Sequence, residues 1–397
     1  MERSAKPPSY LAFAAIDWWY HNRSHSEFQL LTRLSRDHKV LVVNSIGMRM
    51  PLPGKTSRPF YKIWRKTKSI ARLLKRPDPG LPNFYVYSPI PWPFYGSEVT
   101  RRFGAWFVRT QVSVAAWIAD IQDPVIFITT PLALPIIAKL KRRFLIYNRS
   151  DKHSLFKEGN TVVMKELEEK LLTSADVTIY ANRTLMAEEV SLTKGRAIHL
   201  DHGVDSAHFK PSEAMREPAD LARIPKPRIG FFGALRSYMV DFSLFVRLAR
   251  EIPEAQIVVI GDPQDSIAEL EGIDNIHLLG QKPYSEIPSY GAFFDVALLP
   301  YQNNDWIRYC NPIKMKEYLS LGLMVVSTDF PEAHNYEDRI RIAASSEDMV
   351  KLVRDCLANP IGPQERNDLR DSVADETWDD RAKRLAEYVD NQVRESR

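Results

Sequence analysis

The sequence predicts two α/β domains, each built on a doubly wound parallel sheet, and three observations carry that prediction. Short apolar runs rich in β-branched and aromatic residues alternate with amphipathic helical stretches along the whole chain. Such runs are typical of parallel strands that helices cover on both faces. The length of 397 residues fits two domains of roughly 100 to 200 residues each. A segment with four prolines, 211–227, precedes a fresh apolar run, so we place the linker there.

Each apolar run bounded by glycine, proline or polar residues is taken as one strand. In the first half we expect strands at 10–16, 40–44, 84–87, 125–129, 144–147, 177–180 and 197–200. In the second half we expect them at 228–232, 256–260, 276–279, 296–299 and 324–327. Helical stretches fill most of the gaps, so the strands of each half form a parallel sheet.

These elements give an N-terminal Rossmann-like domain over 1–205 and a second one over 206–375. The last stretch, 376–397, predicts a charged amphipathic helix with Trp378, Leu385 and Val389 near one stripe. Two placements stay open for it. The helix either closes the second domain at its surface or packs back on the first domain.

Composition excludes several classes of protein. Hydrophobic residues make up 44% and charged residues 26% of the chain, and no window approaches the 18 uninterrupted apolar residues of a spanning helix. The two cysteines, Cys310 and Cys356, have no metal-like spacing. The first apolar run, 11–16, is too short for a signal peptide. We therefore expect a cytoplasmic protein whose thiols are reduced.

Charge is distributed unevenly along the chain. Residues 1–150 carry 24 Lys and Arg against 8 Asp and Glu, whereas the remaining residues carry 30 against 42. The segment at about 49–76 holds ten basic residues, no acid and interleaved aromatic and aliphatic side chains. Such a segment favours an anionic membrane surface, although a solvated basic helix or a nucleic-acid patch has the same composition. We expect the membrane and no nucleic acid, because no nucleic-acid motif accompanies the segment.

Two glycine turns in the second half predict where an anion can bind. In open α/β sheets, ligands collect outside the carboxyl ends of the strands, and a glycine there lets backbone N–H groups approach a phosphate. Gly233 and Gly261 each follow a predicted strand, and Arg236 lies just beyond the first turn. Neither turn is a GxGxxG fingerprint. Each glycine taken alone therefore also fits an ordinary tight turn.

A stronger pattern follows the strand at 296–299. The sequence LLPY ends at Tyr301, and ten residues later NPIKMKEYLSLG predicts a helix with Asn311 as its cap and Pro312 in its first turn. Lys314 and Glu317 are three residues apart and share a face of that helix. A lysine can neutralise a diphosphate while a glutamate accepts from ribose hydroxyls. From spacing alone, an exposed ion pair is an equal alternative.

These motifs resemble the GT-B glycosyltransferases, in which two Rossmann-like domains face each other across a cleft. The matching residues are HGVDSAHF at 202–209, GFFGAL at 230–235, LLPY and NPIKMKEYLSLGLMVVST. The resemblance implies that the second domain binds a nucleotide-sugar, with UDP favoured. It also implies the donor-binding residues Gly233, Ala234, Arg236, Gly261, Tyr301, Asn311, Lys314, Met315 and Glu317. No metal and no other cofactor is expected.

The mechanism is predicted from a departure and a second resemblance. Retaining members of glycosyltransferase family four carry a glutamate eight residues before the position of Glu317, where this chain has Tyr309. The stretch FLIYNRSDKHS is similar to the one that bears the catalytic aspartate in the membrane-associated glucuronosyltransferase of xanthan synthesis. This similarity implies an inverting transfer with Asp151 as general base. A helix or turn cap is the alternative role of Asp151.

The opening of the chain resembles the same glucuronosyltransferase and predicts an acceptor side in the first domain. Asp17, Trp18, His21 and Arg23 follow the first strand and could line the path of a lipid-linked or growing glycan. Aromatic rings suit sugar faces and arginine suits a lipid phosphate. We expect an enzyme bound peripherally to the inner face of the cell membrane. The alternatives are a retaining GT-B transferase, a scaffold without turnover and a GT-B sugar epimerase.

Overall fold

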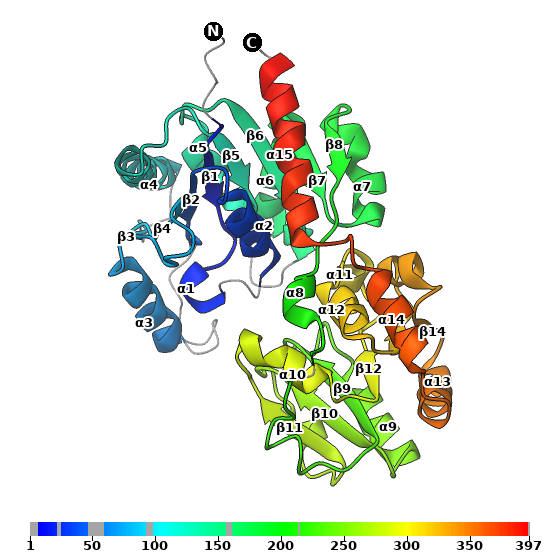
Figure 1. Cartoon of the computed structure of the whole chain (residues 1–397). Coiled ribbons are helices and arrows are strands. Elements are labelled where there is room, and N and C mark those ends of the chain that lie inside the picture. The colour runs from blue at the N-terminus through cyan, green and yellow to red at the C-terminus, as the bar shows by residue number, and fades with distance from the viewer. Residues whose placement is uncertain are drawn as a thin grey trace. The chain divides into compact units, whose positions relative to one another are not determined.

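The computed structural model describes residues 7–21, 25–46, 59–92, 98–155, 161–212 and 215–395. The chain forms two compact units (Figure 1). The first unit comprises Met1–Asp201 and Arg381–Arg397, and the second comprises His202–Asp380. The predicted boundary after residue 205 lies four residues beyond this division, and the expected linker at 211–227 lies inside the second unit.

The first unit is built on an eight-stranded sheet with the order β3-β4-β2-β1-β5-β6-β7-β8. All neighbouring strands pair in parallel except β3 and β4, which are antiparallel. The strands are β1 (Tyr10–Phe13), β2 (Val40–Val43), β3 (Leu74–Lys75), β4 (Phe84–Tyr87), β5 (Val125–Ile128), β6 (Phe144–Arg149), β7 (Val177–Tyr180) and β8 (Ala197–His199). Most central strands are buried along their whole length, because helices lie on both faces of the sheet.

The helices of the first unit alternate with these strands. They are α1 (Trp18–His21), α2 (Ser26–Leu34), α3 (Pro59–Ile70), α4 (Glu98–Ile118), α5 (Leu134–Ile137), α6 (Thr161–Ser174) and α7 (Arg183–Glu189). The final helix, α15 (Trp378–Glu395), begins in the second unit and belongs to the first from Arg381 onward. Its Leu385 and Val389 are fully buried, and Arg381 forms a 2.8 Å ion pair with Asp201.

The second unit is built on a six-stranded, fully parallel sheet with the order β11-β10-β9-β12-β13-β14. The strands are β9 (Arg228–Phe232), β10 (Gln256–Ile260), β11 (Ile276–Gly280), β12 (Val296–Leu299), β13 (Val325–Thr328) and β14 (Arg341–Ala343). The helices are α8 (Ser206–Phe209), α9 (Phe242–Glu251), α10 (Ile287–Gly291), α11 (Asp305–Arg308), α12 (Ile313–Leu321), α13 (Ser346–Ala358) and α14 (Pro363–Asp371).

The predicted strands are confirmed, with shifts of a few residues at their ends. Two further strands, β3 and β14, are short and lie at sheet edges. In each sheet the strand order reverses at one point, between β1 and β5 in the first unit and between β9 and β12 in the second. Open α/β sheets bind ligands at the carboxyl ends of the strands beside such a switch point.

None of the described helices combines the length and apolarity needed to cross a bilayer. The described residues also contain no group of three or more His, Cys, Asp or Glu side chains arranged to hold a metal ion.

Candidate active site

At the switch point of the second unit, the side chain of Lys314 packs against Gly233. Gly233 follows β9 with a φ of +150°, in the region that favours glycine. A Cβ at this position would overlap Cε of Lys314 and lie 2.7 Å from its Nζ. The lysine side chain therefore lies directly over the turn, and any side chain at position 233 would have to displace it.

Gly261 has a different role from the one expected. A Cβ at Gly261 would overlap the carbonyl oxygen of Gly233, so the glycine lets the ends of β9 and β10 approach each other. The N–H of Gly261 donates to Gly280 (3.0 Å), and the N–H of Gly233 donates to Ile260 (2.8 Å). Both amides are thus used within the sheet. Among the described residues no carbonyl accepts from the N–H of Ala234, the next residue of the turn, and this residue is exposed.

Helix α12 begins one residue later than predicted. Its N-cap is Pro312, and no side chain caps the helix, so the prediction of Asn311 as cap was wrong. Asn311 is instead buried. The helix ends at Gly322, whose φ of +73° is left-handed as in many helix termini.

Lys314 and Glu317 lie half-buried on one face of α12. Burial lowers the pKa of Lys314, and the charge of Glu317 partly offsets this effect. Burial raises the pKa of Glu317 to about 7, against the opposing influence of Lys314. Among the described residues neither side chain makes a hydrogen bond or an ion pair. The face therefore presents a desolvated cation and a carboxylate that can bind a ligand.

Lys316, on the same helix, has a structural role. Its side chain is 1% exposed and forms a 2.5 Å ion pair with Glu376. Its Nζ also donates to the carbonyl oxygen of His202 at 2.5 Å. Lys316 thus ties α12 to the first residue of the second unit and to a residue near its last, and it is not available to a ligand.

Three other expected donor residues differ in their surroundings. The side chains of Tyr301 and Met315 are buried in the hydrophobic core, so a ligand can meet only their backbone. The N–H of Tyr301 donates to Oγ1 of Thr328 (3.0 Å). Arg236 is half-buried, and its guanidinium donates to the hydroxyl of Tyr238 (2.7 Å).

In the first unit, β6 ends in a fully buried arginine that carries a network of ion pairs. The guanidinium of Arg149 donates twice to Glu189, at 2.9 and 3.1 Å, and also to Glu168. It donates further to the Tyr147 hydroxyl (3.1 Å) and to the carbonyl oxygen of Asp151 (2.9 Å). Arg149 thereby fixes the backbone of the segment that bears the predicted base.

Asp151 is half-buried at the carboxyl end of β6, and its Oδ2 accepts from the Ser150 hydroxyl (3.1 Å). Its negative charge acts on three neighbouring groups: His25, Glu27 and His153. Burial lowers the pKa of His25 to about 4, although Asp151 opposes this shift. Burial also lowers the pKa of His153. The structure therefore brings Asp151 together with two neutral imidazoles.

Glu27 is a buried carboxyl group that the sequence did not single out. It lies in the first turn of α2, and its oxygens accept from the backbone N–H groups of Ala15 (3.3 Å) and Ile16 (3.4 Å). Burial raises its pKa to about 7, while a hydrogen bond from Thr129 favours the charged form. Since Ala15 follows β1 and Thr129 follows β5, Glu27 joins the two loops at the switch point. In the sequence, the only feature that could have pointed to Glu27 is its position as an acidic residue in the first turn of a helix.

The predicted acceptor residues fall into different environments. The carboxylate of Asp17 accepts from the Ser69 hydroxyl (2.6 Å) and the Trp19 N–H (3.0 Å), so it fastens α3 to the loop after β1. Trp18 is 7% exposed and packs against aromatic rings of the core. His21 is exposed. Arg23 lies outside the described residues, as do the first basic residues of the 49–76 segment, Arg49, Lys55 and Arg58.

The rest of the basic segment forms α3 and the residues that follow it. Tyr61 and Trp64 are 50% and 56% exposed and stack on each other, and Lys68 lies 5.0 Å from the Trp64 ring. Four of its described cations contact other groups of the unit. Arg72 lies 4.3 Å from the Trp19 ring, and Arg76 donates to the Tyr85 hydroxyl (2.6 Å). Arg65 lies 3.7 Å from the Tyr20 ring, and Lys66 donates to the Ser45 carbonyl (2.7 Å).

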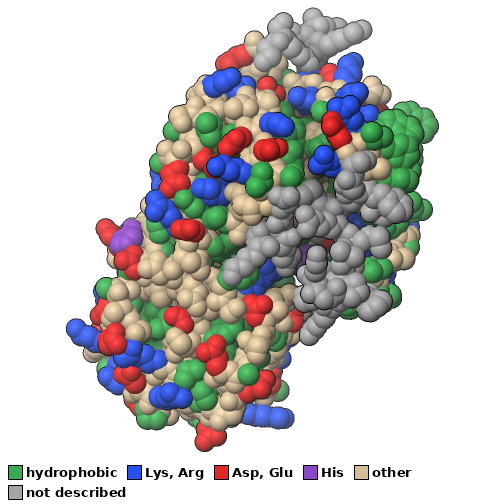
Figure 2. Space-filling model, turned by 180° about the vertical axis from the view of Figure 1, so that it is seen from behind, with side chains coloured by type: hydrophobic (Ala, Val, Ile, Leu, Met, Phe, Trp, Pro, Cys, Tyr) green, Lys and Arg blue, Asp and Glu red, His purple; other side chains and the backbone are tan. Residues whose placement is uncertain are grey.

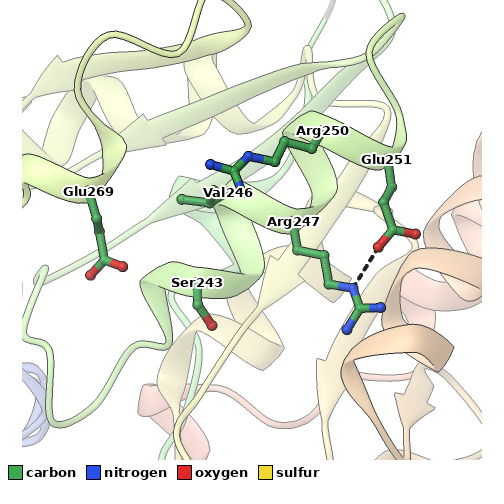
Figure 3. Close-up of a pocket in the computed structure, with 6 residues that line it drawn as sticks. All are labelled: Ser243, Val246, Arg247, Arg250, Glu251 and Glu269. Carbon is green, nitrogen blue, oxygen red and sulfur yellow. Dashed lines mark hydrogen bonds and ion pairs between the residues drawn. The ribbon is translucent and has the colours of Figure 1, made fainter.

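A surface pocket of the second unit shares none of these residues. It lies along α9 and is lined by Ser243, Val246, Arg247, Arg250, Glu251 and Glu269 (Figure 3). Arg247 is already neutralised by Glu251 (2.7 Å) and Glu347 (2.6 Å).

The two doubly wound sheets, parallel except for the edge pair β3–β4, match the GT-B fold of glycosyltransferases in solved structures. HepE (Alr3699) of Anabaena, solved in complex with UDP and glucose, superposes with a TM-score of 0.68 at 15% identity, covering 97% of this chain and 100% of that one. Sucrose-phosphate synthase (tll1590) of Thermosynechococcus elongatus gives a TM-score of 0.70 at 13% identity, covering 97% and 99%.

The second unit is also similar in sequence to known glycosyltransferases. Residues 226–359 match the family described as Glycosyl transferases group 1. TuaH of Bacillus subtilis (strain 168), assigned by its name to teichuronic acid biosynthesis as a glycosyltransferase, is 25% identical over 190 residues. That match covers 46% of this chain and 47% of TuaH, so the chain spans about half the length of this curated relative.

Proposed function

We propose that this protein is a glycosyltransferase that moves a sugar from a nucleotide-sugar, with a UDP-sugar favoured, to a glycan acceptor. One observation carries the proposal. Lys314 and Glu317 lie on one face of α12 with no partner among the described residues, beside a glycine turn at the switch point of the sheet. Burial lowers the pKa of Lys314, and an anionic ligand bound there would raise that pKa again and favour the charged form.

The two side chains suit the two polar parts of a nucleoside diphosphate. The Lys314 ammonium neutralises the diphosphate, and the exposed Ala234 amide adds a donor beside it. The Glu317 carboxylate accepts hydrogen bonds from the ribose hydroxyls. HepE, whose structure contains UDP and glucose, has the same fold, and this supports a UDP-linked donor.

For the chemistry we propose an inverting transfer with Asp151 as general base. The acceptor oxygen forms a bond to the anomeric carbon while the bond from that carbon to the diphosphate oxygen breaks. The acceptor proton passes to the Asp151 carboxylate, and the nucleoside diphosphate leaves with its charge stabilised by Lys314 and Arg236. Burial lowers the pKa of His25 and of His153 and so weakens both imidazoles as alternative bases. No metal or other cofactor is part of this proposal.

We further propose a lipid-linked or growing polysaccharide acceptor on the inner face of the cell membrane. The basic balance of residues 1–150 and the exposed aromatic and basic residues of α3 support an anionic surface as partner. The match to TuaH, named for teichuronic acid biosynthesis, is consistent with a cell-surface polymer. No nucleic-acid partner is proposed.

Thermal stabilisation by UDP, GDP, ADP and TDP tests the donor site. A ligand at 100 times its dissociation constant adds about 2.7 kcal/mol to the free energy of unfolding. We expect one nucleotide to raise the Tm, with the shift lost in Lys314→Ala and kept in the control Lys351→Ala, an exposed lysine of α13. Equal shifts in both variants would contradict the proposed site.

Product analysis separates the remaining alternatives. An inverted anomeric configuration supports Asp151 as base, whereas a retained one supports a retaining GT-B transferase. Nucleotide binding with neither transfer nor slow donor hydrolysis would identify a scaffold without turnover.

A further inference from the structure

Helix α4 of the first unit has two apolar faces, and only one of them is covered. The buried face consists of Gly104, Val108, Val112, Ala115 and Ala116. The other face is exposed to solvent and carries large side chains. Its members and their exposed fractions are Val99 (76%), Phe103 (42%), Trp106 (49%), Val114 (52%), Trp117 (77%) and Ile118 (61%).

The exposed apolar residues lie along one side of the helix in two groups, with the polar residues Thr110 and Ser113 between them. Val99, Phe103, Trp106 and Trp117 recur at intervals that place them on one side of a helix with 3.6 residues per turn. The stripe from Val99 to Trp117 is about 27 Å long at 1.5 Å per residue. A space-filling view shows hydrophobic side chains gathered on the flank of the first unit where Figure 1 places α4 (Figure 2).

An aromatic cluster stiffens one end of the stripe. The Phe103 ring lies 4.6 Å from the Trp92 ring and 5.3 Å from the Trp106 ring. Ordered aromatic side chains lose little conformational entropy when a partner covers them. Soluble monomers rarely expose apolar stripes of this kind unless they bind something.

The charges beside the stripe are mostly positive. Arg101, Arg102 and Arg109 lie on α4, and Glu98 is its only acid. Arg102 and Arg109 are seven residues apart and therefore flank the stripe on the same side. Arg102 forms an exposed 2.7 Å ion pair with Glu98. Residues 1–150 as a whole carry three times as many basic as acidic residues.

We propose that the exposed stripe of α4 docks on the surface of an anionic lipid bilayer. Tryptophan and phenylalanine rings would enter the headgroup boundary while the flanking arginines pair with lipid phosphates, as in helices that lie in the interface plane. A second copy of this chain is a poorer occupant, because it would bring two sets of arginines together. The helix is too polar to cross the bilayer.

This inference rests on the proposed function in one respect: a membrane surface is useful because the acceptor is lipid-linked. It differs from that proposal in naming α4, rather than the basic segment alone, as the docking surface. Its test measures vesicle binding without any donor. Failure of vesicle binding with an intact nucleotide shift would overturn this inference and the proposed membrane placement but leave the donor site standing, and the reverse result would overturn the donor site alone.

The test is flotation of the full chain with vesicles of phosphatidylcholine, with or without one third phosphatidylglycerol. We expect binding to the anionic vesicles, weakened about tenfold or more in Trp106→Ser/Trp117→Ser. The matched control is Val162→Ser/Leu192→Ser, which removes exposed apolar side chains of the same unit outside α4. Unchanged binding in the tryptophan variant, or equal loss in the control, would overturn the proposal.

A second variant tests the charges. Arg102→Gln/Arg109→Gln should weaken binding to anionic vesicles about fivefold for each arginine and leave binding to neutral vesicles unchanged. Sedimentation of the wild type without lipid tests whether a second copy of this chain covers the stripe instead. A dimer that the tryptophan substitutions dissociate, with no vesicle binding, would assign the stripe to self-association instead.

Discussion

The side chain of Lys314 occupies the place where a Cβ of residue 233 would lie. The two residues are 81 positions apart, yet the lysine Nζ is 2.7 Å from that point. Gly233 is therefore required twice, by its φ of +150° and by the lysine that lies over it. A donor diphosphate that binds Lys314 must also lie close to this turn.

The first prediction concerns Gly233→Ala. We expect the new methyl group to displace the lysine, so nucleotide affinity should fall about as far as it does in Lys314→Ala. The control is Gly195→Ala, where φ is +80° and nothing lies within 4 Å of the added Cβ. This control carries the backbone strain without the collision. Comparable calorimetric affinities in Gly233→Ala and the wild type would refute the contact.

Glu317→Gln should weaken recognition of the ribose. Hydrogen bonds to a charged acceptor contribute about 1.5–3 kcal/mol, so UDP should bind about tenfold or more weakly. The deoxyribose analogue dUDP should lose much less, since it offers fewer hydroxyls. Because the pKa of Glu317 is raised to about 7, the wild type should discriminate UDP from dUDP better at pH 8 than at pH 6. Calorimetric titration at both pH values checks both statements.

Asp151→Asn should abolish sugar transfer and leave nucleotide binding intact. The amide cannot take the acceptor proton, whereas the donor residues belong to the second unit. The measurements are product formation and the nucleotide-induced Tm shift on the same preparation. Full transfer activity in this variant would remove Asp151 from the mechanism.

Glu27→Gln should change the pH dependence of stability. The pKa of Glu27 is about 7 in the folded state against 4.5 for a free carboxyl group. Between these values the folded state holds a proton that the unfolded chain has released, so the free energy of unfolding falls as pH rises from 4.5 to 7. The fall is on the order of 3 kcal/mol, at 1.36 kcal/mol per pH unit.

The wild type should therefore lose stability relative to Glu27→Gln between pH 5 and pH 8. Burial lowers the pKa of His25 to about 4, which contributes the opposite slope, and its Nδ1 lies 3.7 Å from a Glu27 carboxyl oxygen, so the comparison reports on the two groups together. Chemical denaturation at the two pH values measures the difference. The exposed acid of α6 in Glu166→Gln serves as control, and an equal response there would exclude Glu27 as the cause.

Arg149→Met should destabilise the first unit by about 3–5 kcal/mol, because it leaves the buried carboxylates of Glu168 and Glu189 unpaired. Neutralising both in Arg149→Met/Glu168→Gln/Glu189→Gln should recover part of the loss. Denaturant unfolding tests both variants. A triple variant no more stable than the single one would show that the arginine acts by packing rather than by charge.

The sequence was most informative about the central strands. β5 and β12 are continuous apolar runs, and such runs are recognisable because both faces of a parallel strand are buried. β3 and β14 were not predicted from the sequence, because they have only two and three residues and because Lys75 and Arg341 interrupt any apolar pattern. Edge strands pair along one side only, so they need no such pattern.

The candidate site was predictable only in part. The spacing of Lys314 and Glu317 placed them on one face of the helix. It could not show that Lys316 forms an ion pair with Glu376, which lies 60 residues away in the sequence. Helix geometry separates the two lysines, and only tertiary contacts say which one is free. Glu27 was invisible for the same reason, since its burial depends on loops after β1 and β5.

The contacts of Lys316 have a mechanical consequence. The chain passes between the two units twice, near His202 and near Asp380. Two backbone hydrogen bonds join these segments close to the crossing points. The N–H of Val204 donates to the carbonyl oxygen of Glu376 (2.8 Å), and the N–H of Trp378 donates to that of Val204 (3.2 Å). Lys316 of α12 contacts both segments, through the carbonyl oxygen of His202 and the carboxylate of Glu376. The two segments that connect the units are thus joined to each other and to the helix that carries Lys314, so the ends of the second unit and the candidate donor site share one buried lysine-centred contact.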